Sequence, residues 1–243
     1  MNGTSTDLAS EHRESNRVLP GALVFDVNQT LSDMSPLAQR FADVGVAEHL
    51  ADTWFASLLR DGFALTAAGV NPAFADIAKG LLREHLAGEV ADSEAGVEHI
   101  MAGFAELPVH PDVVPGILDL AKLELRLMTL SNGSTSVADA LLERSGVRSE
   151  FNDVLSVEDA DLWKPAKTAY ALALQVSGLP AGEVMLVAVH PWDIDGAHRA
   201  GLRTAWINRD GRRYPGHFAK PDLEVTSVTD LAAKLVESRS PSG

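Results

Sequence analysis

The stretch Ala22-Leu23-Val24-Phe25-Asp26-Val27-Asn28-Gln29-Thr30-Leu31 is the most informative part of this chain. Its first four residues form a short apolar run, which is typical of a buried parallel strand, and Asp26 ends that run. In open α/β sheets, chemistry takes place just beyond the carboxyl ends of such strands. A carboxylate held there suits a nucleophile that forms a covalent ester or acyl phosphate, although an aspartate in an ordinary turn would give the same pattern.

Three later segments repeat this arrangement of an apolar run followed by polar groups. The run at residues 125–130 ends in Ser131-Asn132-Gly133-Ser134, and the run at 154–157 is followed by Lys164-Pro165. The run at 184–189 ends in His190-Pro191-Trp192-Asp193. Because the carboxyl ends of parallel strands meet at one edge of a sheet, we expect these side chains to lie near Asp26.

The order of the expected elements predicts the fold class. Residues 34–106 read as helices at 36–44, 47–61, 72–87 and 92–105, without a convincing strand. Beyond residue 107, helices expected at 113–123, 136–145, 166–177, 197–200 and 228–236 alternate with strands at 125–130, 154–157, 184–189, 203–207 and 223–226. This alternation predicts an α/β fold with a Rossmann-like parallel sheet, helices on both faces, and a helical cap domain inserted after the first strand. We expect a catalytic core of 19–33 and 107–237, a cap of 34–106, a disordered tail at 1–18 and another tail at 238–243.

Composition agrees with a single enzyme domain that carries an insert. The chain has 243 residues, of which 46% are hydrophobic and 22% charged. It contains no cysteine, which excludes disulfides and a cysteine nucleophile and fits a cytoplasmic location. No apolar run approaches the ~20 residues of a membrane span, and residues 1–17 lack the apolar core of a signal peptide. The net charge of −14 argues against nucleic-acid binding, so any anion site must be built locally.

Aspartate, serine, lysine and aspartate at successive strand ends resemble the four-motif signature of the haloacid dehalogenase superfamily, over about residues 19–236. Within it, the sequence is most similar to the L-2-haloacid dehalogenases. Phosphatase members usually carry a second aspartate two residues after the nucleophile, as the acid for the leaving alcohol. Here that position is Asn28, and an amide cannot perform this proton transfer, whereas a halide leaves without protonation. The similarity to that family extends to the string 130–134, to Tyr170 after Lys164-Pro165, and to the strings 206–209 and 224–227. For the last two strings the favoured interpretation is structural, as a strand end and a last turn.

The resemblance implies a covalent mechanism. Asp26 would attack C2 of a short 2-haloalkanoic acid, displace the halide with inversion, and leave an ester that water hydrolyses to a 2-hydroxy acid. Thr30 would hold the Asp26 carboxylate in place, and Lys164 would keep it ionised. Asp193 would pair with Lys164 and help to orient water.

The resemblance also implies the substrate contacts and the partners. Ser131 and Asn132 would bind the substrate carboxylate and help to receive the halide, and Tyr170 would support Lys164 or the carboxylate. Asn28 and Trp192 are further expected contacts to substrate or halide. We expect no metal and no cofactor, a small-molecule 2-haloacid substrate and halide as ligands, no nucleic-acid or membrane partner, and a homodimer.

The sequence departs from the family in four places. Asn28 stands where those dehalogenases often have tyrosine, Ala188 where they have serine, and His190 where they have asparagine. The fourth departure is an arginine of the cap, thought to help the halide leave, which falls near Val46 when the chains are aligned on Trp54. No lysine or arginine occurs between residues 41 and 59.

Two histidines are candidates to compensate for these changes. His49 lies one helical turn after Val46 and could contact the anion, with Arg60 as a less favourable substitute; a solvated histidine is the alternative interpretation. His190 could act as a general base for ester hydrolysis, since its unperturbed pKa of ~6.5 suits that task. The alternative is that His190 is a neutral hydrogen-bonding replacement for asparagine.

Other functions remain open at the level of sequence. A magnesium-dependent phosphatase of the same superfamily could hold the metal through Asp26, Asp193 and the carbonyl of residue 28. A catalytically inactive member could act as a binding or regulatory protein. A hydrolase could also open another strained C2-substituted acid by the same mechanism.

Overall fold

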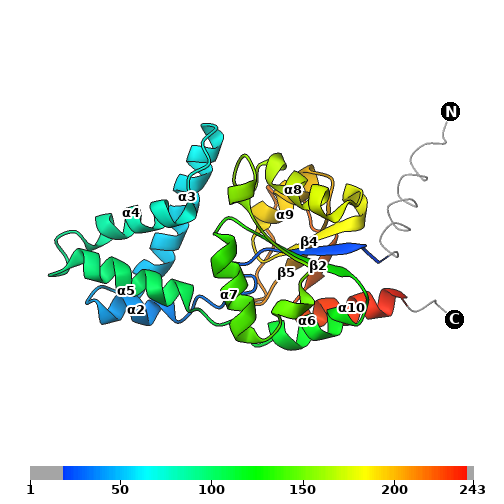
Figure 1. Ribbon diagram of the computed structural model, residues 1–243, viewed down its shortest axis with the longest axis horizontal. Coiled ribbons are helices and arrows are strands. Elements are labelled where there is room, and N and C mark those ends of the chain that lie inside the picture. Colours follow the sequence, from blue (N-terminus) through cyan, green and yellow to red (C-terminus); the bar gives the residue numbers. More distant parts are fainter. Residues whose placement is uncertain (1–18, 240–243) are drawn as a thin grey trace.

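The computed structural model describes residues 19–239 and contains a six-stranded parallel sheet (Figure 1). The strands are β1 (Ala22–Phe25), β2 (Arg126–Ser131), β3 (Asp153–Ser156), β4 (Val184–Ala188), β5 (Arg203–Ile207) and β6 (Leu223–Val225). Their order in the sheet is β3-β2-β1-β4-β5-β6. The chain therefore builds outward from β1 on one side and then returns to β4 on the other. Open α/β sheets bind ligands at such a reversal of strand order. The parallel sheet confirms the predicted α/β class.

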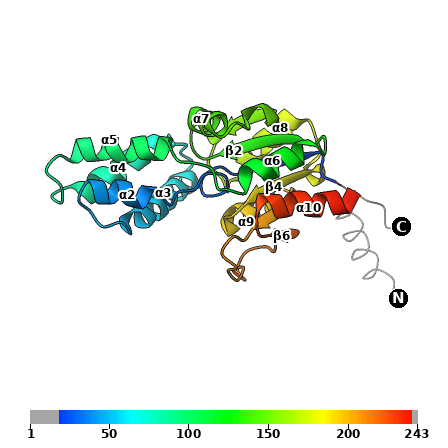
Figure 2. The same cartoon turned by 90° about the horizontal axis from the view of Figure 1, so that it is seen from below.

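Helices cover both faces of the sheet (Figures 1 and 2). On one face, α6 (Val113–Ala121), α7 (Thr135–Ser145) and α10 (Val228–Arg239) pack against a cluster that includes Leu23 and Phe25. On the other face, α8 (Lys167–Ser177) and α9 (Pro191–Arg199) pack against a cluster that includes Ala22 and Val24. Successive strand residues point to opposite faces, so β1 is apolar throughout because both faces are covered.

The segment between β1 and α6 forms four helices beside the sheet (Figure 1). They are α2 (Leu37–Asp43), α3 (Leu50–Ala67), α4 (Phe74–Leu86) and α5 (Ser93–Ala105). Two chain segments connect this cap to the core, and they pair with each other through an antiparallel bridge between Ser32 and Val109. Backbone hydrogen bonds from Asp33 N to Pro108 O (2.8 Å) and from His110 N to Leu31 O (2.9 Å) complete this neck.

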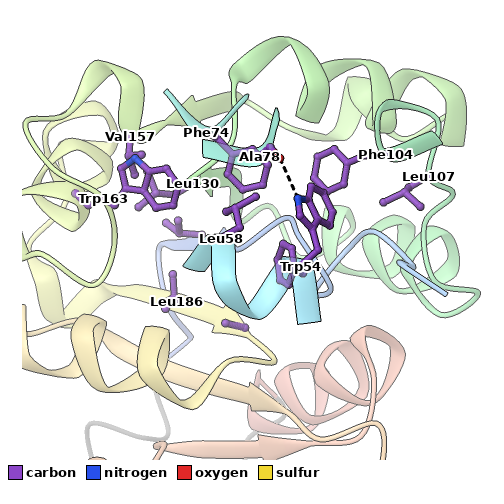
Figure 3. Close-up of a cluster of buried hydrophobic side chains, with 14 of the residues drawn as sticks. Trp54, Leu58, Phe74, Ala78, Phe104, Leu107, Leu130, Val157, Trp163 and Leu186 are labelled. Atoms are coloured by element: carbon purple, nitrogen blue, oxygen red, sulfur yellow. Dashed lines mark hydrogen bonds between the residues drawn. The ribbon is translucent and has the colours of Figure 1, made fainter. Parts of the chain in front are cut away.

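Aromatic side chains fill the cap and join it to the core (Figure 3). The buried Trp54 of α3 donates through Nε1 to Ala78 O at 3.0 Å, which ties α3 to α4. Phe74 stacks between Phe104 of α5 and Trp163, at centroid distances of 5.5 and 5.8 Å. Trp163 precedes Lys164 in the core, so the hydrophobic interior of the cap continues into the segment that carries Lys164.

Two details differ from the sequence-based expectations. Helix α9 begins at Pro191 instead of near residue 197, because proline at the first helical position is already set for the helix and needs no hydrogen-bond acceptor for its nitrogen. Helix α10 ends at Arg239, two residues into the predicted C-terminal tail. The predicted tail at 1–18, and residues 240–243, lie outside the described residues. Within residues 19–239, no helix is long and apolar enough to span a membrane.

Candidate active site

Asp26 lies at the carboxyl end of the central strand β1 and is held by groups from three other segments. Its Oδ1 accepts a hydrogen bond from Lys164 Nζ at 2.8 Å, and its Oδ2 accepts one from Thr30 Oγ1 at 2.7 Å. His190 Nδ1 lies 3.0 Å from the same Oδ2. The Thr30 hydroxyl in turn accepts from the backbone N–H of Val189 at 3.1 Å, which connects this contact to the end of β4. The carboxylate therefore has one well-defined pose.

Lys164 lies between two carboxylates in the buried interior. Its Nζ is 2.7 Å from Asp193 Oδ2, and the Tyr170 hydroxyl donates to Asp193 Oδ1 at 2.7 Å. Asp193 belongs to the first turn of α9, directly after β4. A Cβ at Gly196 would lie 2.5 Å from the Tyr170 hydroxyl, so the glycine allows Tyr170 to approach α9 closely.

Burial and charge give the two aspartates opposite electrostatic character. Burial alone would raise the pKa of Asp26, but the charge of Lys164 and the hydrogen bond from His190 hold it well below its usual range. Burial raises the pKa of Asp193, with Lys164 opposing the shift. Burial alone would lower the pKa of Lys164, and its two carboxylate partners raise it instead. Asp26 is therefore the stronger acid of the two.

His190 is fixed by contacts on both ring nitrogens. Nδ1 faces Asp26, and Nε2 lies 2.9 Å from the side-chain oxygen of Gln29. Gln29 itself has a left-handed backbone with φ of 62°, a conformation that costs energy in a residue other than glycine. Its side chain fixes the orientation of the ring, so that Nδ1 is the nitrogen directed at the nucleophile.

Ser131 ends β2, Asn132 follows it, and both are buried. The side-chain amide of Asn132 is bonded to the Lys164 backbone, accepting from N at 3.0 Å and donating to O at 3.3 Å. Asn132 thus holds the Lys164 backbone in place. The Ser131 hydroxyl accepts from Gly133 N at 2.9 Å, which leaves its own hydrogen for another acceptor.

Aromatic rings connect the cap to the catalytic side chains. Trp192 stacks on His190 with ring centroids 5.0 Å apart, and Lys164 Nζ lies 5.9 Å from the centre of the Trp192 ring. Phe63 of α3 packs edge-on against Trp192 at 4.9 Å. Phe63 is therefore a contribution of the cap to this site that the sequence analysis missed.

The structure does not place His49 where the missing arginine would act. His49 is exposed, immediately before the first turn of α3, and it does not line the cleft described below. Arg60 is also exposed and pairs with Asp61. Our expectation for His49 is therefore corrected: α3 begins only at Leu50, so Val46 and His49 lie in the turn before it, where helical spacing does not apply. Asn28 lines a separate small cavity with Phe104 of the cap.

A cleft of about 800 Å³ lies between α3 and the loop after β5. Phe55 and Leu59 of α3 line one wall, and Gln29, His190 and Arg209 belong to the core side. The cleft thus extends to His190, behind which Asp26 lies. Among residues 19–239, no group of three or more histidine and acidic side chains is arranged to hold a metal ion.

Comparison with known proteins assigns the chain to a family of hydrolases. Residues 20–201 match the model of the haloacid dehalogenase-like hydrolases, and the chain belongs to this family. Its relatives include several (S)-2-haloacid dehalogenases. It is 36% identical over 128 residues to that of Pseudomonas sp. (strain YL), covering 53% of each chain, so this match spans about half of the relative's length. It is 29% identical to (S)-2-haloacid dehalogenase 4A of Burkholderia cepacia, over 89% of this chain and 95% of the relative. The structure of the L-2-haloacid dehalogenase RSc1362 superposes with a TM-score of 0.84 at 29% identity, covering 90% of this chain and 100% of that one.

Proposed function

We propose that this protein hydrolyses short 2-haloalkanoic acids to 2-hydroxy acids through an ester on Asp26. The observation that carries the proposal is the buried Asp26 carboxylate, with Lys164 at 2.8 Å and Asn28 in the place of a phosphatase's general acid. Such a carboxylate is a competent nucleophile toward a carbon that bears a good leaving group. The (S)-2-haloacid dehalogenase relatives support the same reaction.

In the first step, a carboxylate oxygen of Asp26 forms a bond to C2 while the carbon–halogen bond breaks. The bonding pair leaves with the halide, C2 is inverted, and Asp26 becomes an ester. The buried Lys164 and the Ser131 hydroxyl are the donors we assign to the substrate carboxylate and to the negative charge around it. Trp192 and Phe63 exclude water from C2 and contact its apolar substituent.

In the second step, water attacks the carbonyl carbon of the Asp26 ester. We assign His190 as the base, because Nδ1 lies 3.0 Å from Asp26 Oδ2 and Gln29 fixes the ring. Once Asp26 is an ester, its oxygen no longer carries the charge that favours a hydrogen on Nδ1, so this nitrogen can accept one. Nδ1 takes the proton of water, the tetrahedral intermediate expels the 2-hydroxy acid, and the proton passes to the departing alkoxide. The second proton of water, left on the Asp26 carboxyl, is released to solvent, and this restores the carboxylate.

Halide release from a panel of 2-chloro and 2-bromo acids, measured beside a generic phosphatase assay, tests this proposal. We expect halide release and a 2-hydroxy acid product of inverted configuration. We also expect activity to survive exhaustive chelation with EDTA, because Lys164 already contacts both carboxylates that a phosphatase would use for Mg²⁺. Loss of activity on chelation with recovery on adding Mg²⁺, or phosphatase turnover alone, would replace the proposal by a metal-dependent phosphatase.

The cytoplasmic location and the homodimer stay predictions. The cysteine-free sequence is compatible with a reducing compartment. Cell fractionation and sedimentation equilibrium are the direct measurements of these two properties.

A further inference from the structure

We infer that Arg209 is a positioning residue that fixes the loop carrying the nucleophile. This inference rests on the proposed function, in which Asp26 and His190 perform the two steps. Arg209 follows β5 and lies far from Asp26 in the sequence. Its guanidinium Nη2 donates to the backbone oxygen of Thr30 at 3.0 Å, and Thr30 is the residue whose hydroxyl holds Asp26.

Arg209 is itself anchored by a bidentate ion pair. Nε and Nη2 donate to Asp112 Oδ1 at 3.2 Å and Oδ2 at 3.0 Å. Asp112 Oδ2 also accepts from the backbone N–H of Val228, the first residue of α10, at 2.7 Å. Both side chains of the pair are more than four-fifths buried, and a planar guanidinium in such a fork has little freedom to move. The pair therefore connects the nucleophile loop to a helix on the far face of the sheet.

The neighbouring carbonyl groups of the loop are held in the same way. His110 Nε2 donates to the backbone oxygen of Gln29 at 3.0 Å, and the backbone N–H of His110 donates to Leu31 O at 2.9 Å. Three consecutive carbonyls, of residues 29 to 31, are thus bonded to groups outside the loop. These bonds stabilise the left-handed backbone of Gln29, whose side chain orients His190.

This geometry predicts that the loss of Arg209 affects the chemical steps and not the binding of substrate. Arg209 contacts Thr30 and Asp112 and does not contact Asp26. Its loss should displace Asp26 and His190 relative to each other, and displacements of about 1 Å at a reacting centre can cost ~100-fold in rate. We therefore expect Arg209→Ala to lower kcat by about 10-fold to 100-fold with little change in KM.

Chemical rescue provides the decisive test, because Arg209 lines the open cleft and a small cation can enter the space it leaves. Added guanidinium should restore kcat of Arg209→Ala, while urea and sodium chloride at equal concentration should not. Arg83→Ala is the matched control, since Arg83 also makes a bidentate ion pair, with Glu94 at 2.7 and 3.0 Å, but lies in the cap outside this cleft, and it should behave as the wild-type protein. Arg209→Lys, which keeps the charge without the fork, tests the same point if Arg209→Ala does not fold.

A second readout does not depend on turnover. In the imidazole NMR signals, His110 and His190 should shift in Arg209→Ala and return when guanidinium is added. If Arg209→Ala has normal kcat and unshifted signals, or if only KM rises, Arg209 is not a positioning residue. If the wild-type protein releases no halide from any acid of the panel, the proposed function fails, while the NMR signals still decide the inference.

Discussion

At the scale of single residues, the nucleophile is the first group to test. Asp26→Asn should abolish turnover because an amide is a very poor nucleophile, while Lys164 keeps its contact with Asp193 and the fold is retained. In a single turnover of the wild-type protein in labelled water, the label should enter Asp26 first and the product only in the next turnover. Label that passes directly from water into the product would contradict the ester intermediate.

His190 separates the two chemical steps. His190→Phe should keep the stacking on Trp192 but lose the base, so that halide is released once and the ester accumulates. General acid–base groups contribute about 10²–10⁴-fold, and we expect steady-state turnover to fall within that range. Mass spectrometry of the intact protein would detect the added acyl-ester mass. A variant that slows without any accumulated ester would show that His190 serves the first step instead.

The lowered pKa of Asp26 makes a prediction about stability and pH. A carboxyl group with a depressed folded-state pKa stabilises the fold above its unfolded value of ~3.9, and this contribution disappears as the pH falls through the folded value. The difference in unfolding free energy between the wild-type protein and Asp26→Asn should therefore be constant from pH 7 to about pH 5 and shift against the wild-type protein below about pH 4. Denaturant titrations at several pH values measure it, and a difference that already changes near neutral pH would be inconsistent with this shift.

At the scale of helices, the contact between α3 and the core depends on one small residue. A Cβ at Gly62 would overlap the ring of Trp163. Gly62→Ala should destabilise the protein by about 1–3 kcal/mol, as overpacking does, despite the better helix propensity of alanine. Gly80→Ala in α4 is the control, because nothing lies within 4 Å of the added methyl group, and it should stabilise by about 0.5–1 kcal/mol. Equal effects of the two substitutions on the melting temperature would contradict this account.

The arrangement of strands, helices and loops also explains which site residues could be placed from the sequence and which could not. The sequence predicts the proximity of Asp26, Lys164 and Asp193, because the carboxyl ends of parallel strands meet at one edge of the sheet for any conformation of the loops. His49 is misplaced by the sequence argument, because that argument extends the helix to residue 47, whereas α3 begins at Leu50. Arg209 and Gln29 were missed as functional residues, because their contacts join segments whose proximity depends on the folded loops. Arg209 belongs to the string 206–209, which resembles the family, but nothing in the sequence identifies Asp112 as its partner.

At the scale of the whole molecule, the net charge of −14 should slow the approach of an anionic substrate. Raising the ionic strength from about 0.01 to 0.15 M shortens the Debye length from ~30 to ~8 Å and screens this repulsion. We therefore expect kcat/KM for a 2-haloacid to rise severalfold while kcat is unchanged. Sodium sulfate is the appropriate salt because it adds no halide, and a fall in kcat/KM would indicate that local cations dominate the encounter.

The neck formed by Ser32 and Val109 has an evolutionary consequence. The inserted helices leave and rejoin the sheet at one point. Their length and the side chains that they direct at the cleft can therefore change as a unit, without altering the sheet. The inserted helices do not contain the catalytic set of Asp26, Thr30, Lys164 and Asp193. Evolution that replaces these helices can change which acid enters the site while the catalytic residues of the core are inherited unchanged. The condition is that an aromatic partner for Trp163 is kept.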